Sequence, residues 1–283
     1  VVRLTYGEGS RRALTIRFNL GVALIDFGDY QGAREIFSAL LPLMRAQFGP
    51  THPRALWTEL SLATACAGTG DTANALRGFR DVETAMVARP GPTDPNLSTA
   101  QFSQGDLLRQ QGRYPESLAL IERAILTDRL RPGARSRGKT TPNAYFNMIL
   151  TLGAMGDTAA LDSTRLELFR VYETSILRST NTAAALQYYL AYAARALGLG
   201  DEAWTRALEG ERLSRERLRL NVRAMADRRA LEITKKQGGY LELVLELSRG
   251  GDGTRPEAAW DRLVRSRGLV GADLVRRRPR LRP

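Results

Sequence analysis

The stretch NLGVALIDFGDYQGAREIF, residues 19–37, carries a helical apolar pattern on each side of one glycine. Glycine tolerates the left-handed conformation that ends a helix, so Gly28 is expected to stop the first pattern. Asp29 can then accept a hydrogen bond from the free amides that begin the next helix. Beyond it, Ala33 and Phe37 fall on one face. The stretch therefore predicts a helix, a tight turn and a second helix.

The same turn mark recurs along the chain at an almost constant interval. It is written FGDY, TGDT, QGRY, MGDT and LGDE, with the glycines at Gly28, Gly70, Gly112, Gly156 and Gly200. The intervals are 42, 42, 44 and 44 residues. Seven places before the turn stand Gly21, Ala63, Gly105 and Ala193, small residues that allow close helix approach; the fourth repeat has Ile149 there. A fixed period in this range indicates stacked helical units. We expect an all-α fold, an α-solenoid of about five helix pairs with a helical C-terminal extension.

A second repeated mark lies between the units. GPTHP occurs at Gly49–Pro53 and GPTDP at Gly91–Pro95. Glycine and proline end one helix and orient the next, so these segments are interpreted as seams between repeats. His52, the only histidine, then has Asp94 as its counterpart. A catalytic or metal-binding role for His52 is the alternative, but no second histidine supports it.

Residues 19–37 and LLRQQGRYPESLALIERAI, residues 107–125, resemble tetratricopeptide repeats. The 42-residue period and the GPTHP seam resemble the kinesin-light-chain variety. The resemblance covers about Arg12 to Arg206, although Arg165 and Thr205 occupy places where apolar or small residues are expected.

The segment AAWDRLVRSRGLVGADLVRRR, residues 258–278, resembles the helix that precedes the caspase-like domain of bacterial TPR–CHAT proteins, with Arg267 in place of that helix's lysine. The two resemblances together imply a repeat solenoid over residues 1–205 and a helical extension or linker over 206–283. The extension would precede a CHAT peptidase domain that this sequence does not contain.

The resemblance to tetratricopeptide repeats implies a protein or peptide ligand held in a concave groove, which the first helix of each repeat lines. The residues nine places before the turn glycines are Asn19, Ser61, Ser103 and Asn147, and neighbouring candidates are Thr15, Trp57, Asp106 and Asn143. In the kinesin-light-chain variety an asparagine at this place commonly binds partner backbone amides. Two asparagines match and two serines depart. For each candidate, solvation or a bond within the repeat is the alternative interpretation.

No catalytic constellation emerges from the sequence. GARSRGKT, Gly133–Thr140, matches a phosphate-binding loop, with Lys139 as its lysine, but that loop needs a strand before it. The preceding residues are expected to form the second helix of the third repeat, so a basic loop between repeats is favoured over a nucleotide site. Cys66, the only cysteine, is interpreted as a small core residue and not a nucleophile. We expect no enzyme activity, no metal and no cofactor in this chain, because the catalytic pair of TPR–CHAT proteins lies in the later domain.

The net charge of +12 leaves a second hypothesis open. Basic segments at Arg129–Lys139 and Arg276–Arg282 could meet nucleic-acid phosphates, although no aromatic residues alternate with them to stack bases. No apolar run of about 18 residues predicts a membrane span, and no signal peptide pattern is visible. We expect a cytoplasmic bacterial interaction module that regulates an attached caspase-like peptidase, and a nucleic-acid or ribonucleoprotein adaptor is the alternative.

Overall fold

The computed structural model describes residues 10–89, 94–130, 140–174, 183–223, 238–249 and 255–265. Every regular element in these ranges is a helix, which confirms the all-α solenoid expected from the period. The chain forms two compact units that divide between Thr151 and Leu152. Each unit is described by itself.

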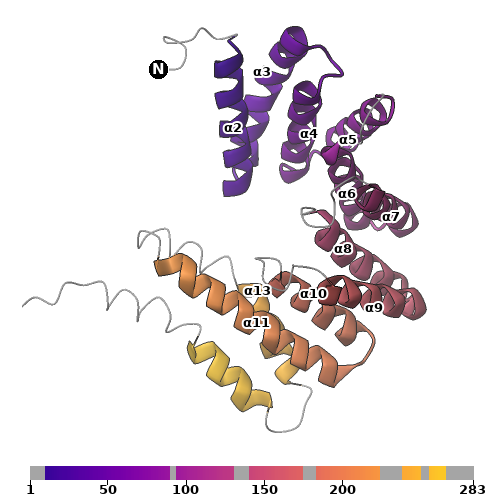
Figure 1. Ribbon diagram of the computed structural model, residues 1–283, viewed down its shortest axis with the longest axis vertical. Coiled ribbons are helices and arrows are strands. Elements are labelled where there is room, and N and C mark those ends of the chain that lie inside the picture. Colours follow the sequence, from indigo (N-terminus) through magenta and orange to yellow (C-terminus); the bar gives the residue numbers. More distant parts are fainter. Residues whose placement is uncertain are drawn as a thin grey trace, which may run out of the picture. The chain divides into compact units, whose positions relative to one another are not determined.

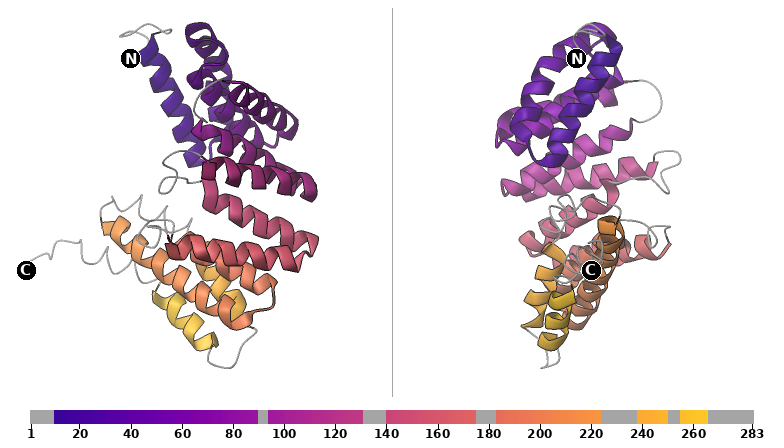
Figure 2. Two further views of the ribbon diagram at one scale, coloured as in Figure 1. Left: turned by 45° about the vertical axis from the view of Figure 1, so that its right-hand side comes forward. Right: turned by 90° about the vertical axis from the view of Figure 1, so that its left-hand side faces the viewer.

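The first unit is a series of helix pairs. Its helices are α2 (Arg11–Phe27), α3 (Tyr30–Phe48), α4 (Pro53–Gly68), α5 (Thr72–Val87), α6 (Pro95–Gln110) and α7 (Tyr114–Leu130), followed by the start of α8 (Thr140–Met155). From α2 to α7 each helix packs against the next, as Figures 1 and 2 show. Helix α4 also contacts α2 and α6, so the first helices of successive repeats are neighbours. They form one side of this unit.

The turn within each repeat has the predicted geometry. Gly28 has φ 82°, and its N–H donates to the Ile25 carbonyl at 2.9 Å. A carboxylate oxygen of Asp29 accepts the N–H of Gly32 at 3.0 Å and so caps α3. Three further turn glycines, Gly70, Gly112 and Gly156, also have positive φ. The left-handed residue at these turns explains why the sequence repeats glycine there.

The seams cap the first helices. The His52 Nδ1 accepts the N–H of Arg54 at 3.2 Å, and Asp94 accepts the N–H of Asn96 at 2.9 Å. A proline follows each cap as the first residue of its helix. The His52 ring also stacks on Phe48, with ring centroids 5.0 Å apart. The interpretation of His52 and Asp94 as equivalent seam residues is confirmed.

The core of the first unit repeats with the same period. Phe37, Phe79 and Ile121, spaced by 42 residues, are each at most 1% exposed. A Cβ added at Gly21 would lie 2.5 Å from the Phe37 ring, so the glycine permits close packing of α2 on α3. Cys66 is buried in the core of the second repeat, as expected, and this burial raises the pKa of its thiol.

The helices of the second unit vary more in length, and α11 is the longest of those described, with 24 residues. They are α9 (Thr158–Thr174), α10 (Ala183–Ala196), α11 (Gly200–Arg223), α13 (Gly238–Ser248) and a helix over residues 255–265. Helix α11 packs against both α10 and α13, and the shared core includes Ala191, Ala207, Leu243, Val244 and Ala259. The expected division into residues 1–205 and 206–283 would fall inside α11. This division stays a prediction.

The last turn differs from the expectation. Its left-handed glycine is Gly198, with φ 73°, whereas Gly200 is the first residue of α11. The Gly198 N–H closes the turn on the Arg195 carbonyl at 3.0 Å. The preceding interval is therefore 42 residues and not 44. With this register Ala203, fully buried, takes the small-residue place that had been assigned to Thr205.

Arg165 stands at a place where an apolar residue is expected, and ion pairs hold its side chain there. It lies nine places after Gly156, where the first repeat has Phe37. Its guanidinium, 12% exposed, contacts Asp162 at 2.7 Å and both carboxylate oxygens of Glu202 at 2.9 Å. Glu202 belongs to α11, so a charged contact joins α9 to α11 here.

Candidate functional site

A hollow of about 160 Å³ opens on the first two repeats of the first unit. Its lining comes from α2, α3 and α4 and consists of Thr15, Phe18, Asn19, Met44, Arg54 and Trp57. Three of the predicted groove residues, Thr15, Asn19 and Trp57, therefore lie together. Thr15 and Asn19 share a face of α2 because they are four residues apart. Trp57 has the place in the second repeat that Thr15 has in the first.

Part of this hollow is apolar. Phe18 packs edge-on against the buried Phe37 ring, with centroids 5.7 Å apart, so its position is set by the core. The Trp57 side chain is 39% exposed and so presents part of its surface to solvent. Met44, only 2% exposed, belongs to the core of the first repeats and adds to the apolar lining. This surface is suited to an apolar side chain.

Asn19 provides an uncommitted amide at the same hollow. Its side chain is exposed and makes no hydrogen bond to any residue that the structure describes. An asparagine amide offers two N–H donors and one oxygen acceptor. It can therefore bind both an N–H and a carbonyl of an extended peptide.

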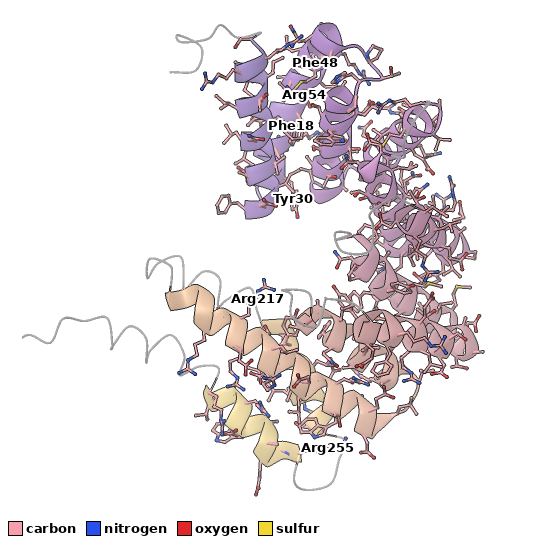
Figure 3. The ribbon with its side chains drawn as sticks, in the orientation of Figure 1. Phe18, Tyr30, Phe48, Arg54, Arg217 and Arg255 are labelled. Carbon is pink, nitrogen blue, oxygen red and sulfur yellow. The ribbon has the colours of Figure 1, made fainter. Side chains whose placement is uncertain are left out.

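Arg54 brings positive charge to the hollow. Figure 3 shows Arg54 beside Phe48. The Arg54 guanidinium lies 5.2 Å from the centroid of the Phe48 ring, and its Nη1 donates to the Thr15 hydroxyl at 3.4 Å. Over the described ranges it forms no ion pair with a carboxylate. A guanidinium held in this way can pair with an acidic group of a ligand.

The serine candidates lie at the same register on the next repeats. Ser61 is on α4 and Ser103 is on α6, and both are half-buried. Ser61 and Ser103 thus occupy the repeat position of Asn19 and are partly exposed, but their side chains are shorter than that of asparagine.

The last group of candidates is occupied by internal contacts. Asn147, 7% exposed, accepts the Arg109 Nε at 2.8 Å and donates to the Asn143 carbonyl at 3.3 Å. Asp106 contacts the same arginine at 2.9 Å and accepts the Gln110 amide at 2.9 Å. Asn143 itself is exposed. Asn19 and Asn147 therefore differ, because only Asn19 has its amide available.

Three lining residues, Phe18, Met44 and Arg54, were not among the candidates predicted from the sequence. Phe18 stands one position before the candidate Asn19 on α2. Met44 belongs to a second helix, α3, whereas the candidates were counted on first helices only. Arg54 lies one helical turn before Trp57, and this i, i+3 spacing is the signal that could have found it. None of these three positions follows from the turn period alone.

No observation on the described residues supports a metal site, a nucleotide site, a nucleic-acid site or a membrane span. The described residues contain no group of three or more side chains able to hold a metal ion. Residues 133–139 of the phosphate-loop match and the basic tail Arg276–Arg282 lie outside the described residues. The element before that loop is helix α7 and not a strand. Among the described helices, none combines the length and the apolar character that crossing a bilayer requires.

Family models and solved structures identify the repeats. Two models described as tetratricopeptide repeat match residues 11–86 and 60–135. The chain thus contains tetratricopeptide repeats, as the sequence predicted. No curated protein matches it in sequence.

Three solved structures share the fold. A putative kinesin light chain of Podosopora anserina with nearly identical TPR-like repeats is 18% identical, covers 74% of this chain and 97% of its own, and has a TM-score of 0.59. BtubC (BKLC) from P. vanneervenii is 14% identical over 96% of each chain, with a TM-score of 0.57. The Rap conjugation gene regulator of plasmid pLS20, solved with the Phr* peptide, is 13% identical over 92% of this chain and 74% of its own, with a TM-score of 0.54. The α-solenoid fold of tetratricopeptide type is thereby confirmed.

Proposed function

We propose that this chain is a non-enzymatic interaction module that binds an extended protein segment or peptide at the hollow on α2, α3 and α4. The observation that carries the proposal is the uncommitted amide of Asn19 beside the partly apolar hollow. The Rap regulator lends support, since it was solved with a peptide and has a similar fold.

Different lining residues would recognise the backbone and the side chains of the ligand. Asn19 would bind one peptide unit of the ligand through both its N–H and its carbonyl oxygen. Phe18 and Trp57 would take one apolar side chain, since aromatic surfaces supply much of the binding energy in such contacts. Arg54 would pair with an acidic group next to that side chain. The preferred ligand is an extended segment with an apolar residue beside a carboxylate.

The candidates beyond this hollow have a secondary role in the proposal. Ser61 and Ser103 continue the register along α4 and α6 and would extend the contact. Asn143 and Asp106 would meet only a longer ligand. Asn147 would contribute little, because Arg109 and Asn143 already satisfy its amide.

The test is a selection of displayed peptides on the purified chain, followed by affinity measurements on variants. Trp57→Ala and Asn19→Ala should each weaken the selected peptides by about tenfold or more, the scale of one well-placed contact. Leu126→Ala is the matched control, because Leu126 is an exposed apolar residue of α7 outside the hollow. Equal affinity for the Trp57→Ala and Leu126→Ala variants, each folded by circular dichroism, would contradict the proposed site.

We further propose that this module regulates a caspase-like cysteine peptidase in a longer bacterial cytoplasmic protein, with residues 206–283 as the connecting extension. The support is the resemblance of residues 258–278, of which 258–265 lie in a described helix. Peptide binding would act by favouring one of two arrangements of the repeats and the extension. Sequencing the reading frame beyond Pro283 tests this: a following domain with one catalytic histidine and one catalytic cysteine supports it, and a stop codon removes it.

A further inference from the structure

We propose that the second unit holds a binding site for a small organic phosphate ester, in a hollow of about 460 Å³ on α10, α11 and the helix over residues 255–265. This site lies outside the peptide site proposed above and does not depend on it. The residues that carry the inference are Gln187, Trp204, Arg206, Leu208, Arg212 and Arg262. The volume is within the range of small-molecule sites, roughly 300–1,000 Å³.

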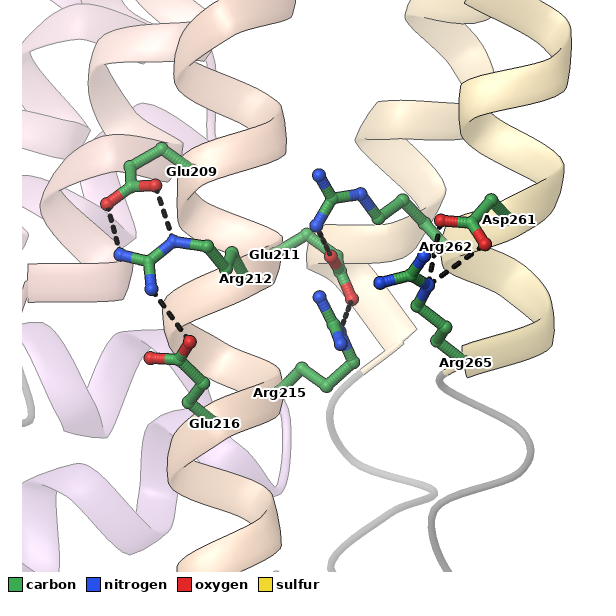
Figure 4. A network of polar contacts seen from close by, with 8 residues as sticks. All are labelled: Glu209, Glu211, Arg212, Arg215, Glu216, Asp261, Arg262 and Arg265. Carbon is green, nitrogen blue, oxygen red and sulfur yellow. Dashed lines mark hydrogen bonds and ion pairs between the residues drawn. The ribbon is translucent and has the colours of Figure 1, made fainter.

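The lining has more positive than negative charge. It includes three guanidinium groups and a single carboxylate, Glu209. Arg212 binds Glu209 in a bidentate manner, at 2.8 and 2.7 Å, and its third nitrogen contacts Glu216 at 2.7 Å (Figure 4). The one lining carboxylate is therefore neutralised by Arg212, and Arg206 and Arg262 leave the lining with a positive excess.

Arg262 holds only a long contact to its carboxylate. Its Nη1 is 3.5 Å from Glu211, whereas Arg215 is 2.9 Å from the same side chain (Figure 4). Glu211 is only 2% exposed, so the closer arginine already compensates its buried charge. If Arg262 turns toward an anion in the hollow, Glu211 keeps its ion pair with Arg215 at the other carboxylate oxygen.

Arg206 also has only a long contact to a carboxylate that another arginine binds more closely. Its Nε is 3.7 Å from Glu202, a residue that Arg165 already contacts with both carboxylate oxygens at 2.9 Å. The guanidinium lies over the Phe169 ring, 4.7 Å from the centroid, and this stacking holds its plane in place. A pair of oriented guanidinium groups binds phosphate oxygens well, because their N–H groups form charge-assisted bonds.

Gln187 adds an amide whose N–H groups have no protein partner among the described residues. Its side chain is 3% exposed, and its carbonyl oxygen accepts Arg206 at 3.4 Å. The amide N–H groups make no hydrogen bond within the described part of the chain. The amide N–H groups can therefore donate to an oxygen atom of a ligand in the hollow. Arginines and an amide supply donors on several sides, which is the chemistry of an anion site.

An apolar portion adjoins these donors and selects the body of the ligand. Trp204 and Leu208 are four residues apart on α11 and line the hollow together. The Arg255 guanidinium lies 5.6 Å from the centroid of the Trp204 ring. A flat ring or short hydrocarbon attached to the phosphate would lie against these two side chains. Inorganic phosphate would make only the polar contacts.

The experiment is calorimetric titration of the whole chain with phenyl phosphate and, separately, with inorganic phosphate. Phenyl phosphate should bind saturably at one site and more tightly than inorganic phosphate. Arg262→Gln should weaken phenyl phosphate by about tenfold or more, the scale of one lost charge-assisted contact. Arg265→Gln is the matched control, because Arg265 lies one turn later on the same helix and contacts only Asp261 among the described residues. It should bind like the unmodified chain.

A second variant guards against misfolding of Arg262→Gln. Thr205 is exposed and lines the hollow, so Thr205→Glu adds a negative charge there with little effect on packing. It should also weaken phenyl phosphate by about tenfold or more. Absence of saturable binding, equal losses in the Arg262→Gln and Arg265→Gln variants, unchanged affinity in Thr205→Glu, or equal affinity for the two probes would each overturn the proposal. None of these results affects the peptide site in the first unit.

Discussion

Replacing Gly198 with alanine should destabilise the second unit, whereas the same replacement at Gly200 should not. Gly198 has φ 73° and closes the turn before α11, and Gly200 begins the helix with ordinary backbone geometry. An added Cβ would meet no heavy atom within 4 Å at either position. The two variants therefore differ in backbone conformation and not in packing.

The magnitude follows from the left-handed backbone. An L-residue in this region costs about 1–2 kcal/mol, and the turn allows no other conformation without losing its hydrogen bonds to the Arg195 and Ala194 carbonyls. At Gly200, alanine restricts the unfolded chain and stabilises the protein by about 0.4–1 kcal/mol. The free energies of unfolding of the two variants should differ by about 1.5–3 kcal/mol, with the Gly198 variant less stable.

The measurement is urea unfolding followed by tryptophan fluorescence in a Trp57→Phe background. The remaining tryptophans, Trp204 and Trp260, both belong to the second unit, so the signal reports that unit. Gly28→Ala is a control for the first unit, because Gly28 has φ 82° and equally open surroundings. A larger loss of stability for Gly200→Ala than for Gly198→Ala would contradict a turn at Gly198 and place it at Gly200, as the pattern LGDE suggested.

Three further predictions concern buried side chains. Phe37→Ala should lower the free energy of unfolding by about 3–5 kcal/mol, because Phe37 is fully buried, while the exposed Leu43→Ala should change urea unfolding little; similar losses in both would contradict the packing. Cys66 should react slowly with iodoacetamide, and the reaction rate should rise only at higher pH than for an ordinary thiol, because burial raises the pKa of the Cys66 thiol. A reaction rate like that of the urea-unfolded protein would contradict this burial. Burial also raises the pKa of Tyr189 from 10.0 to about 12, so the folded chain keeps a proton that the unfolded chain releases. Stability should therefore fall as pH rises from 10 to about 12, and Tyr189→Phe should reduce that slope; an unchanged slope would oppose it.

The fold was predictable because its turns need a residue type that is visible in the sequence. Only glycine adopts the left-handed conformation without cost, so Gly28, Gly70 and their counterparts mark the period directly. The pattern failed where two glycines stand two residues apart. Choosing between Gly198 and Gly200 depends on which amide closes on the last helical turn, and composition does not show this.

The candidate site was only partly predictable for a related reason. Helical periodicity places Thr15 and Asn19 on one face, and the 42-residue period adds Trp57. The contribution of Met44 depends on how α3 packs against α2 and α4, which the period does not specify. The internal bonding of Asn147 depends on Arg109, which is 38 residues away in sequence.

The most direct test of the peptide-binding proposal is site-specific photo-crosslinking to a displayed peptide selected on the unmodified chain. Benzoylphenylalanine would replace Trp57 in one sample and Leu126 in another, since both are exposed apolar residues of the first unit. The peptide should crosslink at position 57 and not at position 126, and excess unlabelled peptide should abolish the product. Crosslinking at position 126 alone, or equally at both positions, would contradict a binding site at the hollow formed by α2, α3 and α4.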